Sequence, residues 1–296
     1  MKVLMATNGS PESGAALRTA LRLLAPVNRI VDLLCVAPAA PRKTLPAARD
    51  RYESRILRET TQILERTRAG AGSGGGSVST VTEVGSPAGV IVSRSEGYDL
   101  TVVGARNREV GGLGPVASRV VEHAEGPVLI ARELRVEGAA RILVAVDGSE
   151  ASFRAVETLA SLFNLESAEV CLMHVAETPW LQLGLDGDWA SSSDEEKEKS
   201  ESGVWEHEMV REGETIMEQA RDLLRGLRLS VTTRLDEGNP ANEILSEAER
   251  GQYDLIALGA TSTRDLKHRM LGSVSSKVAW SAPCSVLIVH EPETAE

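Results

Sequence analysis

Residues 253–275 of this 296-residue chain read YDLIALGATSTRDLKHRMLGSVS. The apolar run at 253–258 has the length of a buried strand and is followed by Gly259. After Gly272 an amphipathic stretch predicts a helix, so two glycines bracket a polar loop between a strand and a helix. Glycines let backbone N–H groups approach an anion, and a helix N-terminus adds unpaired donors and partial positive charge. The stretch therefore predicts one strand–loop–helix unit of an α/β fold, with an anion site at the end of the strand.

An internal repeat organises the rest of the chain. Five segments recur in the same order, among them VLMATNGS near the N-terminus and LVAVDGS near the middle. The matching pairs are 3–10 with 143–149, 34–37 with 173–176, 85–88 with 238–241, 98–104 with 253–259, and 113–118 with 271–276. The order of these matches predicts two domains built from one repeated unit, at residues 1–136 and 140–296.

Each copy alternates between strand and helix patterns. In the first copy we expect strands at 2–7, 30–37, 78–84, 99–103 and 127–131, and helices after the capping Ser10 and at 46–69, 87–96 and 115–124. Such alternation, with apolar strands, predicts an α/β fold in which helices sandwich a doubly wound parallel sheet. In such sheets ligands bind at the carboxyl ends of the strands, near the point where the strand order reverses.

Composition narrows the class of protein. Hydrophobic residues make up 42% and charged residues 25% of the chain, which is typical of a soluble globular protein. A net charge of −11 disfavours attraction to nucleic acid or an anionic membrane. The N-terminus turns polar by Asn8, and no apolar run approaches membrane-spanning length, so we expect a cytoplasmic protein without nucleic-acid or membrane partners. Cys35, Cys171 and Cys284 lie in or beside apolar runs without metal spacing, which predicts buried reduced thiols.

The glycine pattern of the second copy resembles the nucleotide loop of the universal stress protein (UspA) family. In that family a glycine is followed three residues later by a second glycine, and ten residues after that by Gly-Ser. Gly259, Gly272 and Ser273 are in register with this pattern, whereas Ser262 stands at the place of the second glycine. The resemblance covers nearly the whole chain and implies, in each copy, a five-stranded parallel sheet of order 3-2-1-4-5 flanked by helices.

The resemblance also implies ATP or a related adenine nucleotide, which Mg²⁺ can accompany, bound once per chain in the second copy. Asp147 would accept hydrogen bonds from the nucleoside, a role that suits an acceptor-only carboxylate. From the residues alone, Asp147 has an equally good alternative role, which is to begin the turn and cap the next helix. The implied binding residues are Ala145, Asp147, Val175, Gly259, Ser262, Arg264, Gly272, Ser273, Val274 and Ser275.

The first copy departs from the same pattern. Asn8 replaces the aspartate, Asn107 stands at the second glycine's place, and Ala117 replaces a serine. Pro115 removes a hydroxyl and a backbone donor at the phosphate end. We therefore expect the first copy to serve as a structural partner that does not bind nucleotide.

The apolar last strand of the first copy, at 127–131, and the corresponding strand at 284–289 are edges that invite pairing. The resemblance implies that they join the copies as an intramolecular pseudo-dimer, and further homodimerisation stays open.

Three functions fit the sequence. The first is a regulatory module that binds ATP and couples nucleotide level to an unidentified protein partner in a stress response. The second is a slow ATPase, although no P-loop Lys-Ser pair and no evident base accompany the loop, so we assign no catalytic residue. The third is a scaffold without nucleotide.

An acidic insertion at 178–203 includes Asp186 and Asp188. We expect a solvated loop leading into a helix there, because the calcium-loop pattern is incomplete.

Overall fold

A computed structural model describes residues 1–41, 44–70, 76–105, 112–134, 138–177, 195–227, 229–261 and 271–290, with the backbone alone at 46 and 195–208. Within these ranges strands and helices alternate, and the first half contains β1 (Lys2–Ala6), α1 (Pro11–Leu23), β2 (Ile30–Ala37), α2 (Pro46–Gly70), β3 (Ser77–Val84), α3 (Pro87–Ser95), β4 (Leu100–Gly104), α4 (Pro115–His123) and β5 (Val128–Ala131). The start of α1 and both bounds of every other element in this half fall within one residue of the sequence-based expectation.

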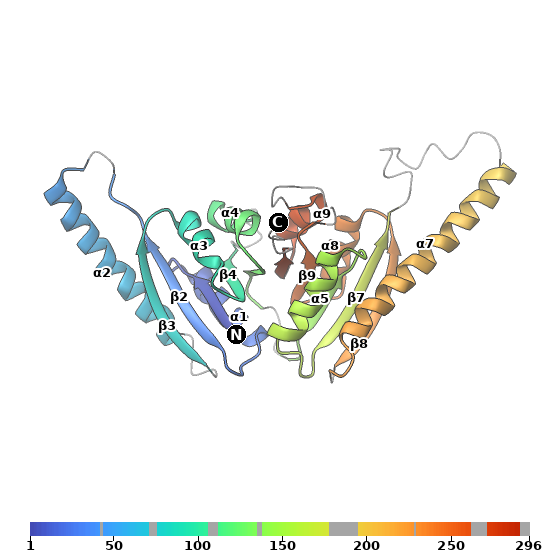
Figure 1. Ribbon diagram of the computed structural model, residues 1–296, viewed down its shortest axis with the longest axis horizontal. Helices are drawn as coiled ribbons and strands as arrows, with labels where there is room; N and C mark the ends of the chain where they lie inside the picture. Colours follow the sequence, from blue (N-terminus) through green and yellow to red (C-terminus); the bar gives the residue numbers. More distant parts are fainter. Residues whose placement is uncertain are drawn as a thin grey trace, which may run out of the picture.

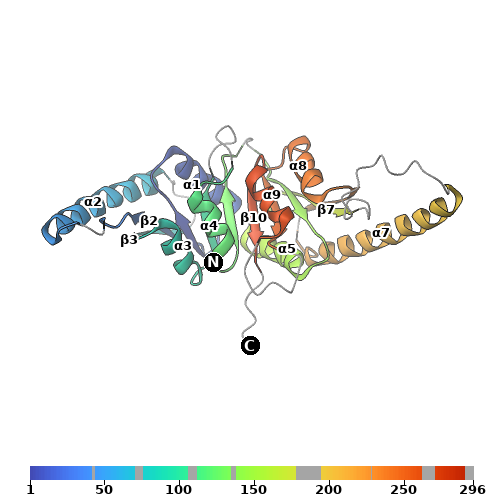
Figure 2. The same ribbon diagram turned by 90° about the horizontal axis from the view of Figure 1, so that it is seen from above.

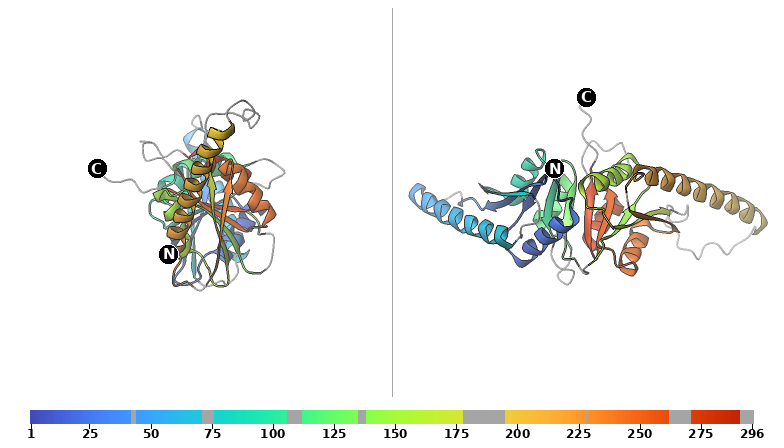
Figure 3. Two further views of the ribbon diagram at one scale, coloured as in Figure 1. Left: turned by 90° about the vertical axis from the view of Figure 1, so that its right-hand side faces the viewer. Right: turned by 90° about the horizontal axis from the view of Figure 1, so that it is seen from below.

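The second half repeats the arrangement with β6 (Arg141–Ala145), α5 (Glu150–Leu162), β7 (Glu169–Ala176), α7 (Glu195–Leu223), β8 (Ser230–Glu237), α8 (Pro240–Arg250), β9 (Leu255–Gly259), α9 (Ser273–Ser281) and β10 (Ser285–Val289). The predicted α/β alternation is confirmed in both halves. The long helices α2 and α7 run outward at opposite ends of the molecule (Figures 1 and 3).

The ten strands form a single sheet of order β3-β2-β1-β4-β5-β10-β9-β6-β7-β8. Within each half the strands are parallel and follow the predicted order 3-2-1-4-5. The halves meet where β5 and β10 pair antiparallel, with Leu129 opposite Leu287. Figure 2 shows α4 and α9 on either side of this junction. The two apolar terminal strands thus protect one another's edges from other partners.

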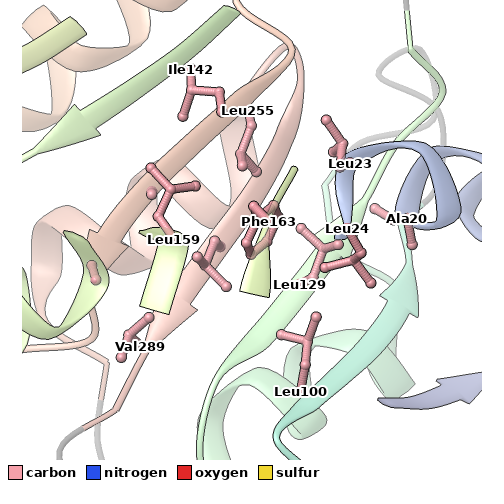
Figure 4. Packing of buried hydrophobic residues seen from close by; sticks show 14 of the residues in the cluster. Ala20, Leu23, Leu24, Leu100, Leu129, Ile142, Leu159, Phe163, Leu255 and Val289 are labelled. Atoms are coloured by element: carbon pink, nitrogen blue, oxygen red, sulfur yellow. The ribbon is translucent and has the colours of Figure 1, made fainter. Parts of the chain in front are cut away.

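Side chains alternate between two buried cores, one on each face of the sheet. In β1, Val3 and Met5 face the core beneath α1, α2, α5 and α7, whereas Leu4 faces the core beneath α3, α4, α8 and α9. Both cores contain residues of both halves. Where α1 and α5 end, Leu24 and Phe163 form an antiparallel bridge, and both side chains are buried between the halves (Figure 4). The halves therefore share their hydrophobic cores.

Local sequence explains how the helices next to the strand ends begin. Ser10 and Ser149 are the N-caps of α1 and α5, and their side chains accept hydrogen bonds from the N–H groups of Ser13 and Ser152. The predicted capping role of Ser10 is confirmed. All three cysteines are buried thiols outside any disulfide, as expected. Among the described residues no helix is both long and apolar enough to span a bilayer.

Candidate functional site

A cavity of about 440 Å³ opens at the carboxyl ends of β6, β7 and β9 in the second half. Its volume falls in the range of small-molecule pockets. Eight of the predicted binding residues line it: Ala145, Asp147, Val175, Gly259, Gly272, Ser273, Val274 and Ser275. The other two, Ser262 and Arg264, lie outside the described residues, as do residues 178–194 of the acidic insertion at 178–203. The fold thus brings together residues from three distant segments of the chain.

Asp147 lies at the turn between β6 and α5, and its carboxylate organises that turn. Its Oδ1 accepts hydrogen bonds from the N–H of Ser149 at 2.9 Å and from the Ser149 hydroxyl at 2.5 Å. Gly148, with φ of +81°, supplies the left-handed residue that the turn requires. The turn role that the sequence left open is therefore present. The side chain is nevertheless exposed at the cavity, and no described residue donates a hydrogen bond to its Oδ2. This oxygen is available to a ligand.

The N-terminus of α9 faces the same cavity. Gly272 is the N-cap and offers no side-chain cap, so the first-turn N–H groups of Ser273 and Val274 have no intrahelical acceptor. The N–H of Gly272 itself donates to the carbonyl oxygen of Ala260 at 2.8 Å. The Ser275 hydroxyl donates to the carbonyl oxygen of Gly259 at 2.7 Å. Ser275 therefore ties the helix to the end of β9, while the free donors and the helix dipole make the terminus suited to an anion.

The loop pattern suggests that Gly259 lets backbone N–H groups approach an anion, but the structure indicates a different need for glycine at this position. A Cβ at this position would lie 2.8 Å from the carbonyl carbon of Ala151 and 2.9 Å from the backbone nitrogen of Ser152. The backbone that approaches Gly259 closely is thus that of α5. At Gly272 a Cβ would lie 3.3 Å from the Ala260 carbonyl oxygen, which is tight but not prohibitive. Gly259 sets how closely α5 packs on β9, and through that packing it sets the shape of the cavity.

Several lining residues escaped the sequence analysis. They are Val146, Ser152, Met173, His174, Ala176, Glu177, Met209, Glu212, Ile216, Pro240, Ile244, Leu258 and Thr261. Among them Met209, Glu212 and Ile216 recur at helical spacing on α7, which is the one signal by which the sequence indicates a shared face. That this face closes a cavity depends on how α7 crosses the sheet. The periodicity alone does not specify that crossing.

His174 is the most polar of the side chains that the sequence analysis missed on the strands. Its Nδ1 lies 2.8 Å from the carbonyl oxygen of Val146. Because a carbonyl oxygen only accepts, Nδ1 carries a proton, and Nε2 is the acceptor when the ring is neutral. The imidazole packs against α7 at Gly213, where a Cβ would lie 2.9 Å from its Cδ2. His174 thus fixes β7 to the residue before Asp147.

The corresponding positions of the first half lack several of these features. Asn8 repeats the turn and accepts from the N–H of Ser10 at 3.0 Å, but it carries no charge. Pro115 is the first residue of α4 and has no N–H to offer. Ala117, which corresponds to Ser275, has no hydroxyl to donate to the strand end. Asn107 lies outside the described residues. The groups that would bind an anion are therefore concentrated in the second half.

Comparisons with known proteins identify the family of this chain. The model of the universal stress protein family matches residues 1–132 and 139–290. A universal stress protein of Bacillus subtilis is 32% identical over 154 residues, covering 51% of this chain and 98% of that protein. One from Methanocaldococcus jannaschii is 30% identical over 154 residues, covering 52% of this chain and 83% of that protein.

Full-length similarity is also found. A universal stress protein of Mycolicibacterium smegmatis is 25% identical over 307 aligned positions, covering 97% of this chain and 96% of that protein. A crystal structure of a universal stress protein from Archaeoglobus fulgidus shares the fold over 98% of both chains, with a TM-score of 0.64 and 20% identity. Since the family model matches both halves, the chain belongs to the universal stress protein family.

Proposed function

We propose that this protein is a stress-response module that binds one adenine nucleotide, ATP, in the cavity of its second half. The observation that carries the proposal is the joint presence, in one cavity of about 440 Å³, of an exposed carboxylate and an uncapped helix N-terminus. A nucleotide needs both, because its sugar offers hydroxyl donors and its phosphates need N–H donors and positive potential.

Each predicted residue has a defined role in this proposal. The Oδ2 of Asp147 accepts hydrogen bonds from the ribose hydroxyls. The N–H groups of Ser273 and Val274 donate to phosphate oxygens, and Ser275 keeps them in place through its bond to Gly259. Ala145 and Val175, which line the cavity at the ends of β6 and β7, contact the nucleoside. Ser262 and Arg264, which the sequence places between Gly259 and Gly272, are proposed to contact the phosphates.

Mg²⁺ has no protein ligand of its own in this proposal. The described residues include no group of three or more His, Cys, Asp or Glu side chains that would hold a metal. Magnesium is commonly bound through substrate phosphates and retained waters, so it would enter with ATP. The protein then acts by binding, and a partner protein responds to the occupied state.

Calorimetric titration with Mg-ATP tests this proposal. We expect one site per chain in the wild type, and a roughly tenfold to hundredfold weaker affinity in Asp147→Ala, because hydrogen bonds to a charged group contribute about 1.5–3 kcal/mol. Asn8→Ala is the matched control, since it removes the corresponding side chain of the first half, and its affinity should equal that of the wild type.

Two outcomes would contradict the proposal. A folded wild-type protein that gives no heat and competes for no fluorescent adenine nucleotide would favour the scaffold. Equal losses in Asn8→Ala and Asp147→Ala would place binding in both halves. Release of inorganic phosphate, followed in parallel, separates a binding module from a slow ATPase.

A further inference from the structure

Helix α9 carries the proposed phosphate donors at its N-terminus, but it has no cation of its own at its other end. No basic residue lies in its last turn. The C-terminal carbonyl groups of a helix have no intrahelical donors and bear partial negative charge, so they need donors or a cation from elsewhere. In α9 this requirement falls at the junction between the two halves, where β10 begins.

Arg132 of the first half meets that requirement. Its guanidinium donates to the carbonyl oxygen of Ala279, in the last turn of α9, at 2.9 Å and to that of Cys284 at 3.0 Å. Its backbone N–H donates to the Ser285 hydroxyl at 3.1 Å, and that hydroxyl lies 3.3 Å from the Arg132 carbonyl oxygen. The backbone of Arg132 is therefore fixed to the start of β10, and its side chain reaches the end of α9 from a fixed point.

The guanidinium is charged where it lies. Burial lowers the pKa of Arg132 to about 10, which leaves the group protonated at neutral pH. Removing a cation from water is costly unless hydrogen bonds replace its hydration. The two carbonyl oxygens and the negative end of the helix dipole supply that replacement.

A second contact from the first half reaches the same end of α9. Gly112, with φ of +66°, lies so close to Trp280 that a Cβ would fall 2.2 Å from the ring carbon Cε3. Only a residue without a side chain fits against the indole there. Arg132 and Gly112 thus contact the C-terminal end of α9, whereas its N-terminal end faces the cavity. Both residues come from the first half, which we propose to be without nucleotide.

This arrangement is not a by-product of the internal repeat. In the register that pairs 113–118 with 271–276, His290 corresponds to Arg132 and Glu122 corresponds to Trp280. The two positions that correspond to Arg132 and Trp280 therefore hold side chains of different chemistry, an imidazole and a carboxylate. The guanidinium and indole contacts described above lie at the C-terminal end of α9, the helix that lines the cavity.

We propose that Arg132 is a positioning residue for the nucleotide site: by binding the C-terminal carbonyl groups of α9, it holds the N-terminal donors of that helix toward the phosphates. The inference rests on the proposed function, and it assigns the first half a definite task. The first half supplies the cation that completes α9, so the chain needs both halves for one site.

The decisive experiment compares ATP with adenosine on the full chain. Arg132→Met keeps the length of the side chain and removes its charge and donors. We expect ATP to bind about three- to tenfold more weakly, which is the scale of helix-terminus electrostatics, whereas adenosine, which lacks phosphates, keeps its affinity. Arg132→Lys retains the charge and should fall between. Arg22→Met is the control, because Arg22 also donates to a backbone carbonyl, that of Gly138, away from α9.

Affinities are measured by displacement of a fluorescent adenine nucleotide, with folding checked by circular dichroism. Equal weakening of ATP and adenosine would show a merely structural role and overturn the inference, as would unchanged ATP affinity in Arg132→Met. Absence of any nucleotide binding in the wild type would instead refute the proposed function on which the inference rests.

A measurement without ligand further distinguishes failure of this inference from failure of the proposed function. Hydrogen exchange of the α9 amides, residues 273–281, should accelerate in Arg132→Met and not in Arg22→Met, while α8 is unchanged. Unaltered exchange across α9 would show that Arg132 does not hold this helix, whatever the nucleotide does.

Discussion

Gly259 illustrates how a single residue constrains the site without touching a ligand. A methyl group added there would overlap backbone atoms of α5 at 2.8–2.9 Å, and backbone atoms cannot turn aside. At the corresponding Gly104 the nearest atom is the Ala16 Cβ at 3.3 Å. We expect Gly259→Ala to lower the free energy of unfolding by about 1–3 kcal/mol, and Gly104→Ala to lower it by less. Urea unfolding of both variants, followed by circular dichroism, measures the difference.

The same pair of variants tests whether the close packing at Gly259 is structural. If Gly259→Ala were as stable as the wild type but bound ATP more weakly, the glycine would be reserved for the ligand, and our interpretation would be wrong. Gly104→Ala controls for a general cost of losing a glycine at the end of a central strand.

Which site residues were predictable follows from how each is positioned. Asp147 lies in a repeated motif after β6, and Gly272 and Ser273 lie in the glycine pattern before α9, so the repeat, the glycine spacing and the family resemblance together indicated them. His174 and Glu212 were missed because their place depends on how β7 and α7 cross, which is a tertiary property. Gly259 was found, but its packing against α5 was not, since no local pattern reports which backbone will approach.

At the level of elements, α3 and α8 offer a matched comparison of helix caps. Asn239, the N-cap of α8, accepts a hydrogen bond from the N–H of Asn242 at 3.1 Å. Ser86, the N-cap of α3, makes no side-chain cap bond. We expect Asn239→Ala to cost about 1 kcal/mol of unfolding free energy and Ser86→Ala to cost little. Chemical denaturation of the two variants measures both, and equal costs would show that the cap bond is not what stabilises α8.

The elements themselves were well predicted because their signals are local. Apolar runs bounded by turns identified β1 to β5, and Ser10 marked the start of α1. The apolar terminal strands indicated edges that invite pairing, whereas the order 3-2-1-4-5 and the pairing of these two strands with one another came from the family resemblance. The reach of Arg132 into α9 was not predictable, because it joins residues about 150 positions apart in sequence through side-chain geometry alone.

At the level of the whole molecule, the shared cores imply that the halves unfold together. Each core contains residues of both halves, and the ends of α1 and α5 bond across the junction, where the N–H of Ala25 donates to Leu162 and that of Asn164 to Leu23. Exposing one half would therefore uncover apolar surface of the other. We expect calorimetry of the wild type to show one cooperative transition, and two separable transitions would contradict this expectation.

Phe163→Ala tests the coupling directly. Phe163 is 4% exposed and lies at the junction beside Leu24, so its truncation should cost about 3–5 kcal/mol and lower the midpoint of the single transition. Phe153, which lies within α5 and is only partly buried, is the control and should cost less when replaced by alanine. If Phe163→Ala unfolded in two transitions and only one of them were shifted, the halves would contact one another at the junction but would not unfold as one cooperative unit. A shift of one intact transition would show that the ten-stranded sheet folds as a single cooperative unit, because loss of one junction side chain would then weaken both halves at once.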